Sequence, residues 1–196
     1  MFVYNAGDAP RRPPTLSLLP PCYRDPSDKD SSGQCLYGEL GHKLRYLDTY
    51  ATGLVQRAGD IVVAELELDT EAASMAAQLV LLRSGEWSVK RPVIISNGQM
   101  MPSSWEAHAV ISVGDRQMCW ADLYRGLIVC SNVLDEEPAL RFVPLPAGMS
   151  EPTRRPRASS RDLCVTSDGT SVTFIAVVPR CCCGGEGATC ILPDLS

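Results

Sequence analysis

The chain has 196 residues, of which 45% are hydrophobic and 21% charged, so it resembles an ordinary globular protein with one sizeable core. The formal net charge is −5 and no dense basic block occurs, which argues against nucleic-acid binding. No apolar run approaches the length needed to span a bilayer, so no membrane association is expected.

The cysteine content and the N-terminus together predict the compartment. Nine cysteines are an odd number, and residues 1–5 lack the long apolar region of a secretory signal. We therefore expect a reducing compartment, cytoplasmic or nuclear, with mostly free thiols and no disulfides.

The first 40 residues predict an N-terminal strand at 2–4, a proline-rich connector, a short edge strand near 16–19 and a polar loop. We assign 1–40 to this strand and connector, and 41–196 to a β domain. Leu44, Tyr46 and Tyr50 alternate with polar residues and predict another strand.

Residues 61–68 form the clearest strand pattern, because apolar and acidic residues alternate in its second half. The inward positions are Ala64, Leu66 and Leu68, and the outward positions are Glu65 and Glu67. A loop or short helix follows, and then strands at 79–83 and 87–89 flank a tight turn at 84–86.

A strand at 107–113 and a hairpin turn at 114–116 lead into the central stretch, 118–146. This stretch predicts three short strands, because β-branched apolar runs alternate with turn residues and end at prolines. A final hairpin is predicted around Asp168-Gly169.

These elements predict an all-β fold of antiparallel meanders. Trp87 and Phe142 each open a strand that soon meets proline, and they stand about 55 positions apart, close to the period of some propeller blades. We therefore predict a partial or irregular β-propeller, with a β-sandwich as the alternative.

Several segments carry a family resemblance. The strongest is Cys-Trp-Ala-Asp-Leu-Tyr-Arg-Gly at 119–126 with Leu-Arg-Phe-Val-Pro-Leu-Pro at 140–146. Further segments lie at 2–7, 17–22, 81–87 and 179–185. In this order they resemble the plant family catalogued as domain of unknown function 1618. More distantly, they are similar to the propeller-like domains that follow F-box motifs and bind proteins.

The resemblance implies no assigned chemistry, and it implies that this chain is a truncated member whose sheet edges stay open.

Catalysis by a Ser or Cys nucleophile normally needs a histidine base. Only His42 and His108 are present, and neither lies in a recognisable motif. We expect no enzyme activity and no cofactor.

The C-terminal cysteines leave one alternative open. Cys181, Cys183 and Cys190 have thiols suited to zinc, and Gly184 and Gly185 allow the chain to bend. Their spacing fits small buried residues better than a zinc motif. A metal-binding or enzymatic domain built on these cysteines is therefore the second reading.

The favoured function is a non-catalytic protein-interaction or scaffold module with a protein partner. Tyr124 and Arg125 are the candidate binding residues, because tyrosine and arginine are enriched where proteins bind one another. Trp120, at the centre of a predicted strand, is assigned to the core.

Overall fold

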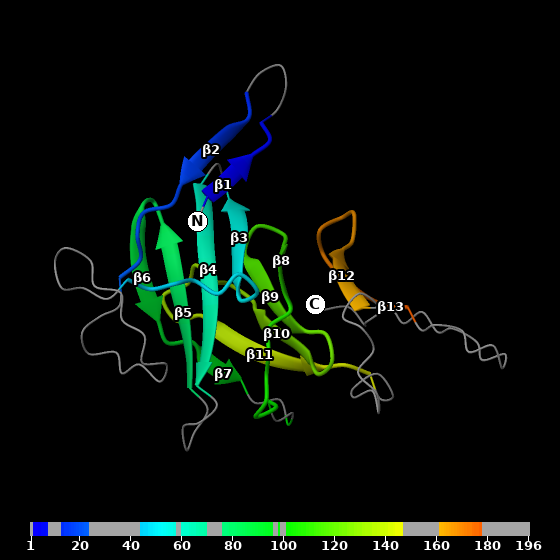
Figure 1. The fold of residues 1–196 in the computed structure, drawn as a ribbon. Helices are drawn as coiled ribbons and strands as arrows, with labels where there is room; N and C mark the ends of the chain where they lie inside the picture. Colours follow the sequence, from blue (N-terminus) through cyan, green and yellow to red (C-terminus); the bar gives the residue numbers. More distant parts are fainter. Residues whose placement is uncertain are drawn as a thin grey trace. The chain divides into compact units, whose positions relative to one another are not determined.

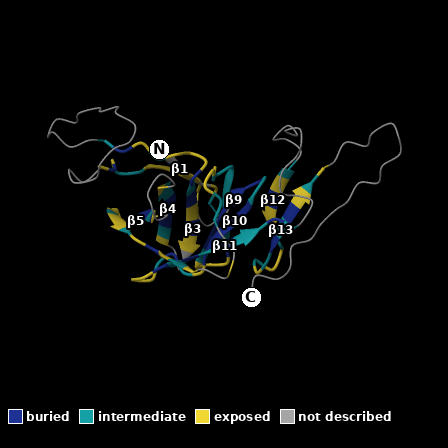
Figure 2. Cartoon of the chain, turned by 90° about the horizontal axis from the view of Figure 1, so that it is seen from below, coloured by how far each residue is buried: buried dark blue, intermediate teal, exposed yellow. Residues whose placement is uncertain are grey.

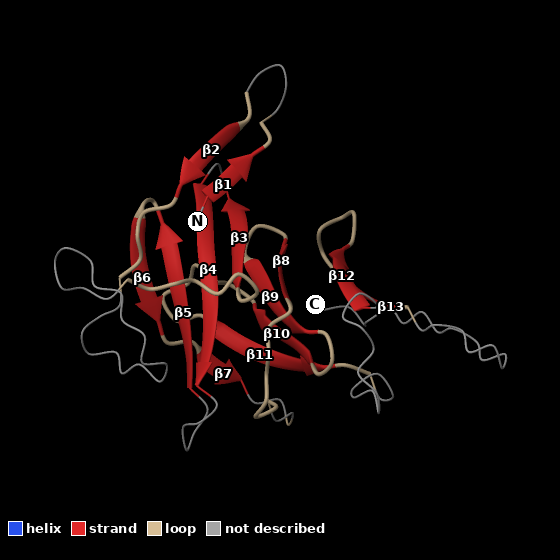
Figure 3. Ribbon diagram, viewed as in Figure 1, coloured by secondary structure: helices blue, strands red, loops and turns tan. Residues whose placement is uncertain are grey.

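The structure is a computed structural model, and it describes residues 2–7, 13–23, 44–57, 60–69, 76–95, 98, 101–146 and 161–177. These residues form strands, turns and loops, which confirms the all-β prediction (Figure 3). Within them there is no helix long and apolar enough to cross a membrane.

Thirteen strands are present in this part of the chain. In order they are β1 (Phe2–Asn5), β2 (Thr15–Leu18), β3 (Thr52–Arg57), β4 (Asp60–Asp69), β5 (Ala76–Arg83), β6 (Glu86–Lys90), β7 (Val93–Ile95), β8 (Ala109–Val113), β9 (Gln117–Asp122), β10 (Gly126–Cys130), β11 (Ala139–Pro144), β12 (Arg161–Val165) and β13 (Val172–Ala176).

The strands form two larger sheets and two hairpins (Figure 1). One sheet is the meander β3-β4-β5-β6, and the other has the order β7-β11-β10-β9-β8. The hairpins are β1-β2 and β12-β13. The pairings whose register is defined are antiparallel except one, because β7 joins β11 in parallel.

The chain divides into two compact units. The first comprises residues 1–47 and 85–87, and the second comprises 48–84 and 88–196. In the first unit, the Trp87 Nε1–H donates to the Pro20 carbonyl at 3.1 Å, and the Arg45 N–H donates to the Cys22 carbonyl at 2.8 Å. The remaining description concerns the second unit.

The sheet built on β9 and β10 is covered on both faces. Register sets Trp120 opposite Ile128, and Cys119 opposite Val129, so adjacent residues of each strand face opposite sides. The result is an unbroken run of buried residues along both strands (Figure 2). This explains why the sequence there reads as continuous apolar runs, whereas β3 alternates between buried and exposed positions.

One face of this sheet packs against the β3–β6 meander and makes the larger core. Its buried members are Val55, Val62, Ala64, Leu66, Ala77, Leu79, Leu81, Met118, Trp120, Ile128, Cys130, Val133, Leu140 and Phe142. The opposite face packs against the β12-β13 hairpin in a second core. Its buried members are Val113, Cys119, Ala121, Leu123, Leu127, Val129, Leu145, Leu163, Val172 and Phe174.

The Ala51 carbonyl connects the two large sheets by hydrogen bonds. It accepts the Trp120 Nε1–H at 2.7 Å and the Leu66 N–H at 3.2 Å. Trp120 is fully buried, so its indole N–H needs a partner within the protein. The assignment of Trp120 to the core follows directly from this geometry.

Gly126, at the start of β10, allows a close approach to the backbone of β11. Its φ is +154°, and a Cβ built there would lie 2.3 Å from the Val143 carbonyl oxygen. That atom belongs to the neighbouring strand and cannot move aside independently, so a side chain at this position would disrupt the pairing of β10 with β11.

Two predictions for the first half of the chain were wrong. The strand expected across Leu44, Tyr46 and Tyr50 is absent, because Leu44 forms only an isolated bridge and residues 45–50 are irregular. Glu65, expected on the solvent side, is 3% exposed. Its Oε1 accepts the Asp48 N–H at 2.6 Å, and this bond compensates for burial of the carboxylate.

Truncation of Trp120 should lower the free energy of unfolding strongly. We expect Trp120→Ala to cost about 3–5 kcal/mol, because it leaves a cavity in the larger core. Trp120→Phe should cost less, about 1–2 kcal/mol, since the phenyl ring keeps part of the packing while the hydrogen bond to Ala51 is lost. Urea denaturation measures both values. Tyr50→Ala, at an exposed site, is the control, and an unchanged stability for Trp120→Ala would contradict the assignment.

Candidate functional site

The β9-β10 turn is organised by the carboxylate of Asp122, which has no exposed surface. The Oδ1 atom accepts the Tyr124 N–H at 2.9 Å, as in a turn closed by an aspartate side chain. The Oδ2 atom accepts the Arg125 Nη1–H at 2.9 Å and the Glu106 N–H at 3.2 Å. These donors together compensate the buried negative charge.

Aromatic and cationic side chains surround this carboxylate. The Nδ1 atom of His108 lies 3.8 Å from Asp122 Oδ1, and the His108 ring meets the Tyr124 ring edge to face, with centroids 5.3 Å apart. Arg161 is the first residue of β12. Its guanidinium lies over the Tyr124 ring, at 4.9 Å from the ring centroid. We call His108, Asp122, Tyr124, Arg125 and Arg161 the turn cluster.

Both binding candidates taken from the sequence therefore lie in one cluster. Tyr124 and Arg125 are adjacent in the turn, and both side chains are partly exposed. Sequence reasoning missed Arg161 and the role of Asp122. Arg161 is 36 positions beyond Arg125 and belongs to another hairpin, so no local pattern connects the two.

The carboxylate of Asp122 is engaged in hydrogen bonds within the turn. Both carboxylate oxygens of Asp122 already accept N–H donors, so this group is not a free base. The five members include an imidazole, a phenol and two guanidiniums, but no Ser, Thr or Cys nucleophile.

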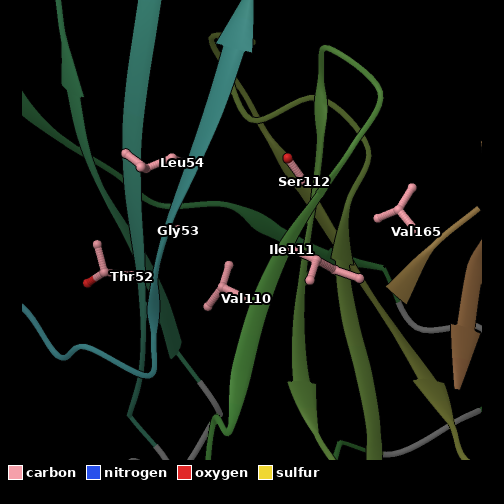
Figure 4. A pocket seen from close by; sticks show the side chains of 7 residues that line it. All are labelled: Thr52, Gly53, Leu54, Val110, Ile111, Ser112 and Val165. Carbon is pink, nitrogen blue, oxygen red and sulfur yellow. The ribbon is translucent and has the colours of Figure 1, made fainter. Parts of the chain in front are cut away.

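A second candidate is a shallow groove of about 470 Å³ between β3 and β8 (Figure 4). It is lined by Thr52, Gly53, Leu54, Val110, Ile111, Ser112 and Val165. Val110 and Ser112 extend from β8 toward β3 in Figure 4. Gly53 lets the strands approach, because a Cβ there would lie 2.4 Å from Val110 Cγ1.

The groove has an uncharged lining, with aliphatic side chains and the hydroxyls of Thr52 and Ser112. Its two sides are formed by one edge strand from each large sheet. Among the described strands, β3 pairs only with β4, and β8 pairs only with β9. Strands at such edges have backbone N–H and C=O groups that can pair with a further chain.

The candidate metal ligands Cys181, Cys183 and Cys190 lie outside the described residues. Within the described ranges, no group of three or more His, Cys, Asp or Glu residues is placed to hold a metal ion. Four cysteines are described there as free thiols, of which Cys22, Cys119 and Cys130 are buried and Cys164 is exposed.

Removal of the Asp122 carboxylate should destabilise the turn and the sheet that carries it. We expect Asp122→Ala to lower the free energy of unfolding by about 3 kcal/mol or more, because its donors lose their buried acceptor. Chemical denaturation followed by tryptophan fluorescence measures the loss. Glu136→Ala, an exposed carboxylate in the β10-β11 connection, should stay within about 0.5 kcal/mol, and similar losses for both would refute the role of Asp122.

The buried thiols should resist alkylation even in mild alkali. Burial raises the pKa of Cys119 to about 12 and that of Cys130 to about 11. Because the thiolate is the reactive form, raising the pH to 9 leaves Cys119 with about one thiolate per thousand. Mass spectrometry after iodoacetamide treatment of the folded protein should find Cys164 modified before the three buried cysteines, Cys22, Cys119 and Cys130. Rapid modification of Cys119 before unfolding would contradict its burial.

A comparison with protein-family models gives a match that begins in the central stretch, 118–146. Residues 120–192 match a family model described as Protein of unknown function (DUF1618). Comparison with curated proteins and with solved structures finds no match. Residues 120–192, which include Asp122, Tyr124, Arg125, Arg161 and the β12-β13 hairpin, are thus similar to a family described as having unknown function.

Proposed function

We propose that this protein is a non-catalytic protein-interaction module that binds an extended, uncharged segment of a partner protein in the β3/β8 groove. The observation that carries the proposal is the placement of two sheet-edge strands on either side of one uncharged groove. An extended segment entering there can pair with edge backbone and place apolar side chains on the lining.

The chemistry of the lining supports binding over catalysis. The seven lining residues carry no carboxylate, imidazole, thiol or amine, so they supply neither a strong nucleophile nor a general base. Val110, Ile111 and Val165 are only partly buried and offer apolar surface at the groove. Ser112 adds a hydroxyl that can hydrogen bond to a partner.

The stacking of the sheets supports a propeller-like arrangement as part of the same proposal. The β3–β6 meander, the four-strand run β8–β11 and the β12-β13 hairpin are packed successively face to face through the two cores. Blades of a propeller pack in this way, and the first strand of each blade lies nearest the axis. The groove residues come from β3, β8 and β12, which would then be the innermost strands.

Filling the groove should abolish binding of linear peptides. Random peptides displayed on phage should yield ligands for the wild-type protein, and Ser112→Tyr should weaken the selected peptides at least about tenfold, because the phenol occupies the groove. Isothermal titration calorimetry measures the affinities.

The control variant is Ser88→Tyr. It makes the same substitution at an exposed position of β6, the other edge strand of the meander, and should leave affinity unchanged. The proposal fails if no peptide is enriched, or if the two variants lose affinity equally while both remain folded by circular dichroism.

A further inference from the structure

We propose that the turn cluster is an oxyanion-binding site, which recognises a phosphate or carboxylate group presented by a partner. The inference does not depend on the groove, since it rests on the charge and geometry of Arg161, Tyr124 and Arg125. The turn cluster is thus a second site, and its ligand is an anion, whereas the β3/β8 groove binds an uncharged segment.

The first observation is the charge of Arg161, which no described carboxylate balances. The guanidinium of Arg161 is partly buried, lies on the Tyr124 ring and donates from Nη1 to the Leu123 carbonyl at 2.7 Å. Among the residues that the structure describes, no carboxylate forms an ion pair with it. A partly desolvated cation of this kind is stabilised by an anion.

The second observation is spare hydrogen-bonding capacity at both arginines. A guanidinium carries five N–H donors in a planar fork, and the bonds described use only Nη1 of Arg125 and Nη1 of Arg161. The side chain of Arg125 is 33% exposed, so its other donors can reach a ligand. The fork matches the oxygen spacing of phosphate and carboxylate groups.

The third observation is that both cations are held in place before any ligand arrives. Arg125 is fixed by the buried Asp122 carboxylate, and Arg161 is fixed by a backbone carbonyl and by an aromatic ring. Binding therefore requires little ordering of these long side chains, whose immobilisation otherwise weakens affinity.

The neighbouring acidic side chains do not neutralise the positive charge of Arg161. Asp122 balances Arg125, and the contact of Glu106 with Asp122 is made by its backbone N–H while its side chain is exposed. Asp162 follows Arg161 in an extended strand, where successive side chains point to opposite faces, and its Oδ1 accepts the Leu163 N–H.

The test is a titration of the whole protein with inorganic phosphate and, separately, with acetate, followed by nuclear magnetic resonance. We expect saturable shifts at the Tyr124 and Arg125 amides and at the arginine Nε–H signals. Arg161→Gln should weaken phosphate binding at least about tenfold, which is the effect of losing one charged hydrogen bond. Tighter binding of phosphate than acetate indicates a phosphorylated partner, and the reverse order indicates a carboxylate.

Arg116→Gln is the matched control, because Arg116 is an exposed arginine in the β8-β9 turn and lies 3.8 Å from Asp115. It should bind phosphate as the wild type does. If Arg161→Gln does not fold, Arg161→Lys replaces it, and it should bind severalfold more weakly because it keeps the charge without the planar fork. Absence of saturation in the wild type, or equal effects at positions 116 and 161, would overturn the proposal. The Ser112→Tyr variant tests the groove and the Arg161→Gln variant tests the turn cluster, so the two proposals can fail separately.

Discussion

The structure depends on one constraint, which is that the sheet containing β9 and β10 is covered on both faces. Each strand must supply apolar side chains to two cores at once, so all positions of the two strands except Gln117 are buried. Two polar side chains that enter this layer have partners within the protein. The Trp120 indole donates to Ala51, and the Asp122 carboxylate accepts backbone and guanidinium donors.

The same constraint positions both candidate sites. Because the central sheet lies between two neighbours, its first strand, β8, lies beside β3 on one side and β12 on the other. The groove residues come from these three edge strands. The turn cluster forms where β8 and β12 begin, since His108 precedes β8 and Arg161 opens β12. β8 and β12 thus contribute to both sites, and β3 contributes to the groove alone.

The strands could be predicted from sequence where local patterns were strong. Apolar runs and turn glycines located β4, β5 and β8–β11, and the Trp87/Phe142 repeat marks corresponding fourth strands of the two meanders. Contacts between distant segments were not predictable. No turn residues signal the parallel pairing of β7 with β11. The burial of Glu65 depends on the N–H of Asp48, 17 positions away. Arg161 contacts Tyr124 only through tertiary packing.

Because the central layer is a single sheet, each of its strands contributes to the stability of two cores. Sequence neighbours such as Cys119 and Trp120 belong to different cores, whereas Trp120 shares a core with Leu79, 41 positions away. Substitution effects along β9 and β10 should accordingly couple with a period of two, strongly between alternate residues and weakly between adjacent ones. Because the two cores share the backbone hydrogen bonds of β9 and β10, we expect them to open as a single cooperative unit in hydrogen exchange.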